Sequence, residues 1–382
     1  MKRRILFVSY AAVLGGAELY LLDIAQAYRE TSRVLLLTDG ILRQRLTEVG
    51  LQVQVLQASQ SLAEVRTSSG LASLKSLSAL WKLAKQVAQI SQEFELVHAN
   101  NQKGFIVAAI ARLLGGAPVV WHLHDILTAR IFSKLNRWIA VTLANRFASK
   151  VIVNSHATGD AFIAVGGNPA LVSVVYNGFS LEPFQQVSHA QTAKIRAELG
   201  VGDWPLLGVF SRISYWKGQH VLLEAIQKLP NVHVMLVGEP LFGEVEYADR
   251  LKQMALEHEF GDRVHWLGFR SDIPALMAAC TIVVHTSTEP EPFGRVIVEG
   301  QLAQRPVIAT AAGGALELVK DGETGWLVPP SDPETLRTVI QSLLANPDRT
   351  AAIAQQGYIH AKSTFALDIQ IANFDRAIDP DS

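Results

Sequence analysis

Residues 281–300 have the sequence TIVVHTSTEPEPFGRVIVEG. The run at 281–285 is mostly apolar and is typical of a buried parallel strand, and residues 296–303 are typical of the first turns of a helix. The segment between them is therefore predicted to be a strand-to-helix loop. Loops of this kind carry the ligand sites of open α/β sheets.

Two glutamates lie in this stretch, Glu291 in the loop and Glu299 in the predicted helix, and Gly294 lies between them. A glycine allows the backbone to come close to a ligand, and two carboxylates that converge on a crevice are suited to binding hydroxyl groups. An isolated pair of this kind is more often a solvated loop charge and a partly exposed helix residue. The rest of the chain has to decide between these interpretations.

The same alternation of apolar strand, loop and helix runs along the whole chain. It predicts an α/β protein with a parallel sheet and helices on both faces in each of two halves, and a cleft between the halves. We place the linker at residues 177–183. The predicted strands are at 4–9, 34–38, 52–56, 96–100, 118–125, 151–155 and 172–176 in the first half, and at 206–211, 232–237, 264–268, 281–285, 306–310 and 325–328 in the second.

The composition excludes several classes of protein. The 382 residues are 49% hydrophobic and 18% charged, which is typical of a globular protein with room for two domains. The apolar runs are too short for a bilayer span, and the run that follows the basic residues 2–4 is too short for a signal peptide. Cys280 is the only cysteine, so no internal disulfide and no thiolate metal site is expected, and we expect a cytoplasmic protein.

Charge is distributed unevenly along the chain. Residues 1–180 contain 18 Lys and Arg against 10 Asp and Glu, a balance of +8, whereas residues 181–382 contain 16 against 25, a balance of −9. The basic half indicates an anionic partner. A predicted helix at 127–147 adds a basic amphipathic pattern. Its apolar side comprises Ile131, Leu135, Trp138, Ile139, Thr142 and Leu143, and its charge comes from Arg130, Lys134, Arg137 and Arg146. Such a helix can lie on an anionic membrane, but an ordinary core helix with a solvated basic face is commoner, and we favour it.

A second group of candidate residues is the segment RISYWKG at 212–218, which leaves the end of a predicted strand and opens a helix. Two cations at a helix N-terminus form a site for a pyrophosphate. Arg212 can bind it in a bidentate way, and Lys217 supplies a mobile point charge. Two solvated surface cations are the alternative, but the buried strand before them and Gly218 after them favour the phosphate site.

Two pairs of glycines open predicted helices, Gly15-Gly16 after the first strand and Gly313-Gly314 after the strand at 306–310. Free backbone N–H groups and the helix dipole make such helix starts suitable for anions, although a tight turn alone also explains glycines. The first pair is neither a dinucleotide-binding fingerprint nor a P-loop.

His124-Asp125 ends the predicted strand at 118–125. A histidine in this place can donate to a sugar hydroxyl, and a structural histidine held by Asp125 is the alternative. His122 alternates with His124 and should point to the same face, and we favour His124 as the ligand because it lies nearer the strand end. A metal cluster with His98 is a further interpretation, but no ligand spacing with carboxylates supports it, and we expect no metal.

Taken in order, these motifs resemble the retaining glycosyltransferases of the GT-B fold, specifically family 4, the glycogen synthase and mannosyltransferase-like group. The resemblance covers nearly the full chain. One departure is Gly300, which stands where an alanine usually follows the second glutamate, and it changes helix propensity and not chemistry. The motifs are GGAE at 15–18, HD at 124–125, NG at 177–178, Arg212-x4-Lys217-Gly218, Glu291-x7-Glu299, Gly313-Gly314 and DGETGWLV at 321–328.

The resemblance implies two facing Rossmann-like domains with parallel sheets and a central cleft. Residues 1–180 would bind the acceptor and residues 181–364 the nucleotide sugar. A C-terminal helix at about 365–382 would pack back on the first domain.

The resemblance also implies roles for individual residues. Arg212 and Lys217 would hold the donor diphosphate, and Glu299 and Glu291 would contact the ribose and the donor sugar. The other implied positions are Phe293, Gly294, Gly313 and Gly314, whose backbone approaches sugar and phosphate, Arg270 and Ile273 near the base, Gly16 near the donor phosphates, and His124 near the donor sugar.

The implied function is transfer of a sugar, with retention, from a UDP- or GDP-sugar to a glycan or lipid-linked glycan of cell-envelope or exopolysaccharide synthesis. Because Arg212 and Lys217 would stabilise the charge of the leaving diphosphate, neither a metal nor another cofactor is expected. We expect no nucleic-acid partner, and a cytoplasmic protein with at most peripheral contact at the inner face of a membrane.

Two alternatives stay open at this point. One is a sugar-nucleotide epimerase or hydrolase on the same fold. The other is a non-catalytic sugar-nucleotide-binding protein, against which the intact set of cations and glutamates argues. An NAD-dependent oxidoreductase would need the dinucleotide fingerprint that the first strand of each half lacks.

Overall fold

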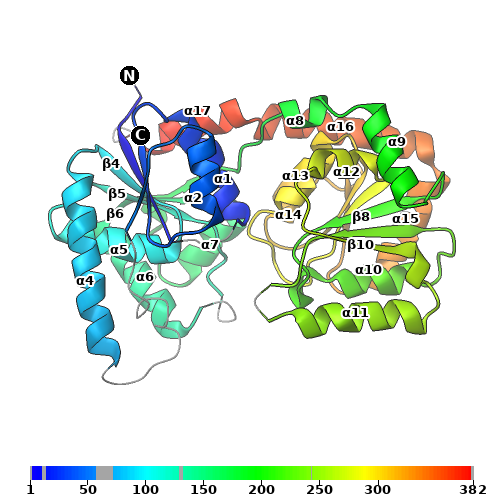
Figure 1. Ribbon diagram of the computed structural model, residues 1–382, viewed down its shortest axis with the longest axis horizontal. Coiled ribbons are helices and arrows are strands. Elements are labelled where there is room, and N and C mark those ends of the chain that lie inside the picture. The colour runs from blue at the N-terminus through cyan, green and yellow to red at the C-terminus, as the bar shows by residue number, and fades with distance from the viewer. Residues whose placement is uncertain (1, 11–13, 57–71, 129–131, 242, 380–382) are drawn as a thin grey trace. The chain divides into compact units, whose positions relative to one another are not determined.

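The computed structural model describes residues 2–10, 14–56, 72–128, 132–241 and 243–379. The chain forms two compact units, coloured along the chain in Figure 1. Unit 1 comprises Met1–Gly178 and Leu367–Ser382, and unit 2 comprises Phe179–Ala366. The boundaries predicted from the sequence, after residues 180 and 364, lie within two residues of those in the structure, after residues 178 and 366. Residues 11–13 of the first glycine loop and the end of the C-terminal segment, 380–382, lie outside the described residues.

The sheet of unit 1 is parallel, with the strand order β3-β2-β1-β4-β5-β6-β7 in the described residues. Alternate residues of the inner strands are buried on opposite faces, because helices cover both. In β1, for example, Leu6 and Val8 belong to one core, and Ile5 and Phe7 belong to the other. The strands are β1 (Ile5–Ser9), β2 (Arg33–Leu36), β3 (Val53–Val55), β4 (Leu96–Ala99), β5 (Val119–Leu123), β6 (Ala148–Val153) and β7 (Val172–Val174).

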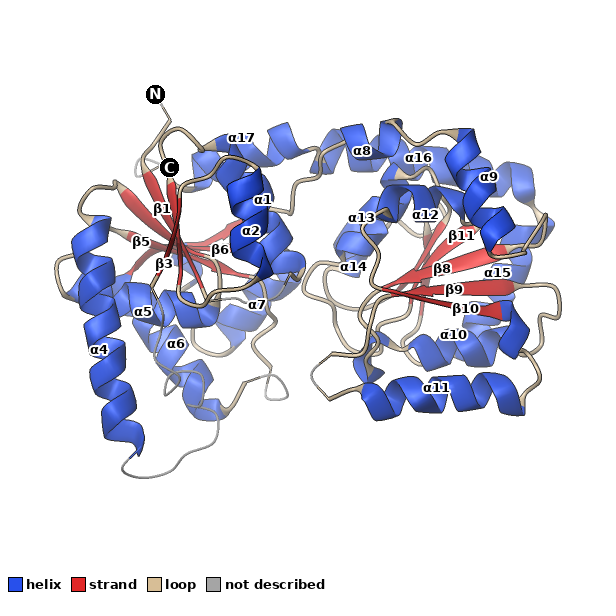
Figure 2. Ribbon diagram, in the orientation of Figure 1, coloured by secondary structure: helices blue, strands red, loops and turns tan. Residues whose placement is uncertain are grey.

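The helices of unit 1 form one layer on each face of this sheet, as Figure 2 shows by colour. The first core packs residues of α4, α5, α6 and α7 against the sheet, and the second packs α1, α2 and α17. These helices are α1 (Gly16–Ala27), α2 (Ile41–Glu48), α4 (Ala72–Ser91), α5 (Gln102–Leu113), α6 (Lys134–Phe147), α7 (His156–Ala164) and α17 (Leu367–Ala377), with a short 3₁₀ turn η1 (Pro169–Leu171).

Helix α17 returns to unit 1 after the chain has passed through all of unit 2. The ring of Phe374 is fully buried and lies edge-on to the rings of Tyr28 and His98, with ring centroids 5.9 Å and 5.4 Å apart. Tyr28 also donates a hydrogen bond to the carboxylate of Asp375. The C-terminal helix is therefore part of the core of unit 1.

Helix α6 corrects the prediction of a helix at 127–147. It begins at Lys134, where the side chain of Ser133 accepts a hydrogen bond from the backbone N–H of Asn136. Its fully buried residues are Ala140, Val141 and Ala144, whereas Leu135 and Trp138 are 62% and 65% exposed. The helix packs on the core as an ordinary core helix does, but Leu135 and Trp138, which the sequence pattern places on its apolar side, are exposed.

The sheet of unit 2 is also parallel, with the strand order β10-β9-β8-β11-β12-β13 in the described residues. This arrangement confirms the prediction of two α/β units with parallel sheets. The strands are β8 (Leu206–Phe210), β9 (His233–Val237), β10 (Val264–Gly268), β11 (Ile282–His285), β12 (Val307–Thr310) and β13 (Trp326–Val328).

Helices again form a layer on each face, with α10 and α11 on one side and α12 and α13 on the other in Figure 2. No helix within the described ranges is long and apolar enough to cross a bilayer. The helices of unit 2 are α8 (Glu182–Gln185), α9 (His189–Glu198), α10 (Gln219–Ile226), α11 (Val245–Glu257), α12 (Ile273–Ala279), α13 (Arg295–Leu302), α14 (Ala315–Leu318), α15 (Pro333–Ala345) and α16 (Pro347–Phe365), with 3₁₀ turns η2 (Tyr215–Lys217) and η3 (Gly261–Arg263).

Candidate functional site

The loops that follow β8 and β11 meet because these two strands are neighbours in the sheet. The ammonium of Lys217 lies 2.6 Å from a carboxylate oxygen of Glu291, and the two side chains are only 15% and 13% exposed. The loops are also joined through Thr286, whose hydroxyl donates to the carbonyl of Lys217 at 2.8 Å, and through Thr288, whose N–H donates to the carbonyl of Trp216 at 2.8 Å. The two motifs predicted separately thus form one site.

The carboxylate of Glu291 accepts further hydrogen bonds. The same oxygen that faces Lys217 is 3.0 Å from the hydroxyl of Ser287 and 3.4 Å from Nε2 of His285. Burial alone would raise the pKa of Glu291, but the charge of Lys217 and the hydrogen bond from His285 lower that pKa well below its ordinary value. Glu291 is therefore an oriented carboxylate.

Both cations of the 212–218 segment lie close to the indole ring of Trp216. The guanidinium of Arg212 is 5.7 Å, and the ammonium of Lys217 4.1 Å, from the centre of the Trp216 ring. Gly218 follows with φ +67°, and a Cβ there would lie 2.0 Å from the carbonyl oxygen of Thr286. This glycine is needed because the two loops approach so closely.

Gly313 and Gly314 pack directly on the backbone of the Glu291 segment. A Cβ on Gly313, whose φ is +63°, would lie 2.3 Å from the carbonyl oxygen of Glu291, and one on Gly314 would lie 2.7 Å from that of Pro292. The N–H of Gly314 donates to the Glu291 carbonyl at 2.7 Å. That N–H is therefore occupied within the protein, and the glycine pair holds the loop as well as opening α14.

Phe293, Gly294 and Glu299 connect this loop to α13. The Phe293 side chain is buried, with its ring 6.3 Å from that of Phe179, so only its backbone is available for the expected contact. Gly294 caps α13 with φ +103°. One turn along the helix, Glu299 pairs with Arg295 at 3.4 Å.

Arg270 and Ile273 lie further along the same edge of the sheet, after the outer strand β10. Arg270 makes a bidentate pair with Asp272, at 2.8 Å and 2.6 Å. This hydrogen-bonded pair raises the pKa of Arg270 and lowers that of Asp272. Ile273 begins α12, two strands away from β8.

Gly16 and His124 belong to unit 1. Gly16 is the first residue of α1, where the Glu18 carboxylate accepts a hydrogen bond from the N–H of Gly15 at 3.0 Å. His124 follows β5, and its ring stacks on that of His122 with centroids 4.1 Å apart, which confirms that the two point to the same face. His122 in turn lies 3.1 Å, nitrogen to nitrogen, from His98.

These three histidines form a buried group of rings, in which His98 lies edge-on to His122 and His122 stacks on His124. Burial lowers the pKa of His98 to about 3 and that of His122 well below its ordinary value, so both rings are uncharged near neutral pH. Across the described ranges, no group of three or more His, Cys, Asp or Glu side chains is placed to hold a metal ion.

Sequence reasoning missed four residues that the structure brings into these sites. His285 and Ser287 bind Glu291, the Trp216 ring contacts both cations, and Asn100 lies 3.1 Å from His124. His285 and Asn100 end predicted strands, as His124 does, and this position is the signal that could have identified them.

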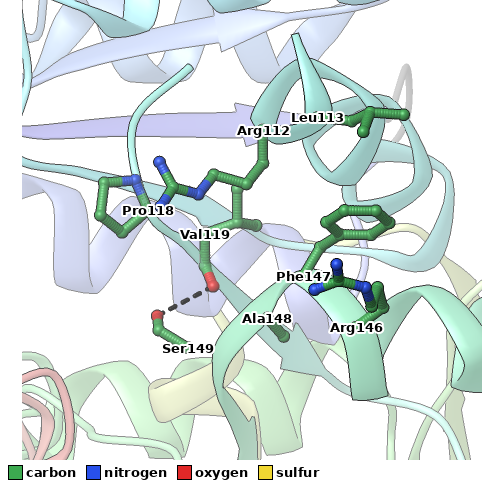
Figure 3. Close-up of a pocket in the computed structure, with 8 residues that line it drawn as sticks. All are labelled: Arg112, Leu113, Pro118, Val119, Arg146, Phe147, Ala148 and Ser149. Atoms are coloured by element: carbon green, nitrogen blue, oxygen red, sulfur yellow. Dashed lines mark hydrogen bonds between the residues drawn. The ribbon is translucent and has the colours of Figure 1, made fainter. Parts of the chain in front are cut away.

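A surface cavity of about 460 Å³ lies elsewhere on unit 1, at the edge where β5 and β6 begin (Figure 3). Of the two arginines that line it, Arg112 donates to the carbonyl of Gly116 at 2.8 Å, and Arg146 lies 5.5 Å from the centre of the Phe147 ring. The cavity is at the opposite end of β5 from His124, so it is separate from the candidate site.

Two family descriptions match the chain. "Glycosyl transferases group 1" matches residues 191–360, and "Glycosyl transferase 4-like domain" matches residues 15–178.

The chain is similar to the crystal structure of HepE from Anabaena in complex with UDP and glucose, with 40% identity and a TM-score of 0.90 over 99% of each chain. For the same protein in complex with UDP-glucose, the identity is 41% and the TM-score 0.89, over 99% of this chain and 100% of the other. A sucrose-phosphate synthase from Thermosynechococcus elongatus shares the fold, with 21% identity and a TM-score of 0.79 over 98% of each chain.

A curated relative, the D-inositol 3-phosphate glycosyltransferase of Mycobacterium marinum, is 27% identical over 313 residues. The match covers 78% of this chain and 66% of that relative. The chain thus spans about two thirds of the length of that protein.

Proposed function

The chain belongs to the glycosyl transferases group 1 family, and we propose that it transfers a glucosyl group from UDP-glucose to a hydroxyl of a glycan or lipid-linked glycan, with retention. Its two parallel α/β units have the GT-B fold. The observation that carries the proposal is the Lys217–Glu291 pair, built where the loops after β8 and β11 meet. The choice of UDP-glucose is supported by the 40% identity to HepE, which binds UDP, glucose and UDP-glucose.

In the proposed complex, Arg212 and Lys217 bind the donor diphosphate. An ammonium has three N–H donors, so Lys217 can keep its hydrogen bond to Glu291 while it donates to a phosphate oxygen. Glu291, held as a carboxylate, is then oriented to accept a hydrogen bond from a hydroxyl of the donor sugar. Glu299 accepts from the ribose hydroxyls.

Breaking the anomeric C–O bond leaves negative charge on the diphosphate and positive charge on the sugar. Arg212 and Lys217 stabilise the former, and each such contact contributes on the order of 2–4 kcal/mol to the transition state, as preorganised electrostatic donors do in other active sites. We propose that a phosphate oxygen of the leaving group takes the acceptor's proton on the same face of the sugar. The new bond then replaces the old one with retention, and no metal is required.

The test is release of UDP from UDP-glucose, measured with and without candidate acceptors and in the presence of a chelator. We expect acceptor-dependent release that the chelator leaves unchanged, and a loss of about 100-fold in Lys217→Ala. Lys228→Ala, which removes an exposed lysine of the same unit, is the matched control.

Three results would count against the proposal. Near wild-type turnover in Lys217→Ala would show that the site is misassigned. UDP release that no acceptor changes would favour the epimerase or hydrolase alternative. Activity that the chelator abolishes and one metal restores would overturn the metal-free mechanism.

We also propose that α6 makes peripheral contact with an anionic membrane. The specific observation is that Leu135 and Trp138 are exposed on this helix, beside Lys134 and in the unit with the positive charge balance. Exposed apolar side chains flanked by cations favour the surface of anionic lipids.

Sedimentation with vesicles tests this contact. Vesicles containing phosphatidylglycerol should bind the protein, those of phosphatidylcholine alone should bind it less, and Leu135→Ser/Trp138→Ser should reduce binding several-fold. Leu256→Ser, at an exposed leucine of α11 in unit 2, is the control. Equal binding by the double variant and the control would exclude α6 as the contact.

A further inference from the structure

Asn100 is a fully buried polar residue at the end of β4, between two positions that the resemblance assigns to the donor. One is His124, which follows β5, and the other is Gly16, which begins α1. The inference drawn from this placement rests on the proposed function, because it concerns the same donor site.

The two ends of the Asn100 amide bind different elements. Its Nδ2 donates to the carbonyl oxygen of Ala17 at 2.9 Å, and its Oδ1 lies 3.1 Å from Nε2 of His124. A carbonyl only accepts, so the amide nitrogen has to face Ala17, and the amide oxygen then has to face His124. His124 must therefore carry its hydrogen on Nε2.

Aromatic neighbours hold the plane of the His124 ring. His122 stacks on it at an angle of 4°, and the Tyr20 ring lies 5.4 Å away at 59°. His122 is itself within hydrogen-bonding distance of His98, at 3.1 Å. Burial lowers the pKa of His98 and of His122, so both rings beside His124 stay uncharged near neutral pH.

We propose that Asn100 is a positioning residue that fixes His124 as the Nε2–H tautomer and couples its orientation to the start of α1. When this tautomer is neutral, the lone pair is on Nδ1. His124 is therefore the acceptor in any hydrogen bond that it forms through Nδ1. The single N–H of the neutral ring is donated to Asn100. The neutral ring therefore cannot be the hydrogen-bond donor to a sugar that the sequence predicts.

The coupling to α1 follows from the same amide. Ala17 is the residue after Gly16, and its carbonyl is held by the side chain that also holds His124. Loss of Asn100 should therefore disturb the helix start and the histidine together, although neither the Gly16 backbone nor the His124 ring is altered chemically.

The first experiment determines the tautomer of His124 without any substrate. Long-range ¹H–¹⁵N correlation spectra of histidine-labelled full-length protein are recorded above the pKa of the ring, with His124 assigned through a His124→Gln variant. We expect one form, Nε2–H, in the wild type and an exchanging mixture in Asn100→Ala. Asn100→Asp, whose carboxylate can still accept from Nε2–H, should restore the single form.

The matched control is Asn101→Ala. Asn101 is the next residue, and its side chain caps α5 by accepting from the N–H of Gly104 at 2.9 Å. This variant should lose stability but keep the His124 tautomer. A shift of tautomer in both variants would mean that the tautomer of His124 responds to a general loss of stability in this region and not to the loss of the Asn100 contact.

The second experiment is kinetic. Asn100→Ala should lower kcat/KM for UDP-glucose by about 10- to 100-fold, with a raised KM for the donor and an unchanged KM for the acceptor. A variant that merely contained less folded protein would lower kcat without this asymmetry.

The inference is overturned if wild-type His124 is the Nδ1–H tautomer, or if folded Asn100→Ala keeps both the tautomer and the donor KM. If the tautomer behaves as expected but the wild type does not turn over UDP-glucose, the positioning role stands and the proposed function fails.

Discussion

At the scale of single residues, the Lys217–Glu291 pair combines a proposed binding role with a structural one. Both side chains are largely buried, and the pair joins loops that are 74 residues apart in the chain. A buried ion pair is not in itself a large source of stability, but an unpaired partner left behind is costly. Single substitutions here should therefore affect folding as well as activity.

We predict that Lys217→Met destabilises unit 2 by about 3–5 kcal/mol, because Glu291 is left buried with only His285 and Ser287. The double variant Lys217→Met/Glu291→Gln should recover most of this loss while activity stays lost. Urea denaturation provides the measurement. Lys228→Met, at an exposed pair with Glu334, should change stability by less than about 1 kcal/mol. A double variant no more stable than Lys217→Met would rule out the unpaired carboxylate as the cause.

The same pair predicts a pH dependence. The folded-state pKa of Glu291 is lowered, so its ionised form contributes stability at every pH above the ordinary glutamate value of about 4.3. This contribution is lost as the pH falls from there towards the folded-state pKa. The stability advantage of the wild type over Glu291→Gln, measured by urea denaturation, should therefore be larger at pH 7 than at pH 4. An advantage that grows on acidification would contradict the assigned sign.

The chemical character of this site could be predicted from the sequence, but the partners of its residues could not. A cation after one apolar strand and a carboxylate after another are visible as a pattern. That Lys217 meets Glu291 depends on β8 lying next to β11, and strand order is a property of packing between distant segments. The orientation of Asn100 could not be predicted for the same reason. Its partner His124 lies 24 residues later in the chain, and its partner Ala17 lies 83 residues earlier.

At the scale of elements, the site depends on loops whose backbones almost touch. Gly313 packs against Glu291 with no room for a side chain, and Gly218 packs against Thr286 in the same way. The sequence indicates that glycines open these helices. The close contact of one loop with the next appears only when the loops are assembled.

We predict that Gly313→Ala lowers the free energy of unfolding by more than the positive φ of this residue alone explains. Gly322 is the matched control, because it also has a positive φ, +71°, but a Cβ there would meet nothing within 4 Å. Gly322→Ala should cost about 1–2 kcal/mol for the left-handed backbone. Gly313→Ala should cost at least about 1 kcal/mol more and lower kcat/KM for the donor by more than about tenfold, because Glu291 must move. Equal losses of stability and activity in the two variants, measured by denaturation and UDP release, would refute this account.

Helix α6 shows which element-scale features the sequence does not determine. Its pattern fits a helix whose large apolar residues face the core, and Leu143 and Phe147 do pack there beside the fully buried Ala140, Val141 and Ala144, but Leu135 and Trp138 do not. Periodicity identifies an apolar side of a helix. Which side packs inward depends on the space left by α5 and the sheet, and this space is set by residues elsewhere in the chain.

At the scale of the whole molecule, unit 1 is built from two separate parts of the chain. Its second core includes Phe374 and Ile378, which follow the whole of unit 2. The resemblance implied a returning C-terminal helix. Its contacts with Tyr28 and His98 follow from the packing alone.

We predict that Phe374→Ala destabilises unit 1 by about 3–5 kcal/mol and leaves unit 2 unchanged, since its ring fills a core position in unit 1 only. Hydrogen exchange provides the measurement, with faster exchange expected in β1, β4 and α1. Arg376→Ala, at an exposed residue of the same helix, should have little effect. Equal loss of protection in β8 and β11 would show that the two units unfold together.

The return of α17 also has a consequence for biosynthesis. A ribosome completes every described strand of unit 1, and then all of unit 2, before it delivers the helix that packs on Tyr28 and His98. For that interval the nascent first unit carries an open apolar face, which is the kind of surface that chaperones bind. The unit begun first is therefore the last to be finished, and its yield in the cell should depend on how well that face is protected during translation.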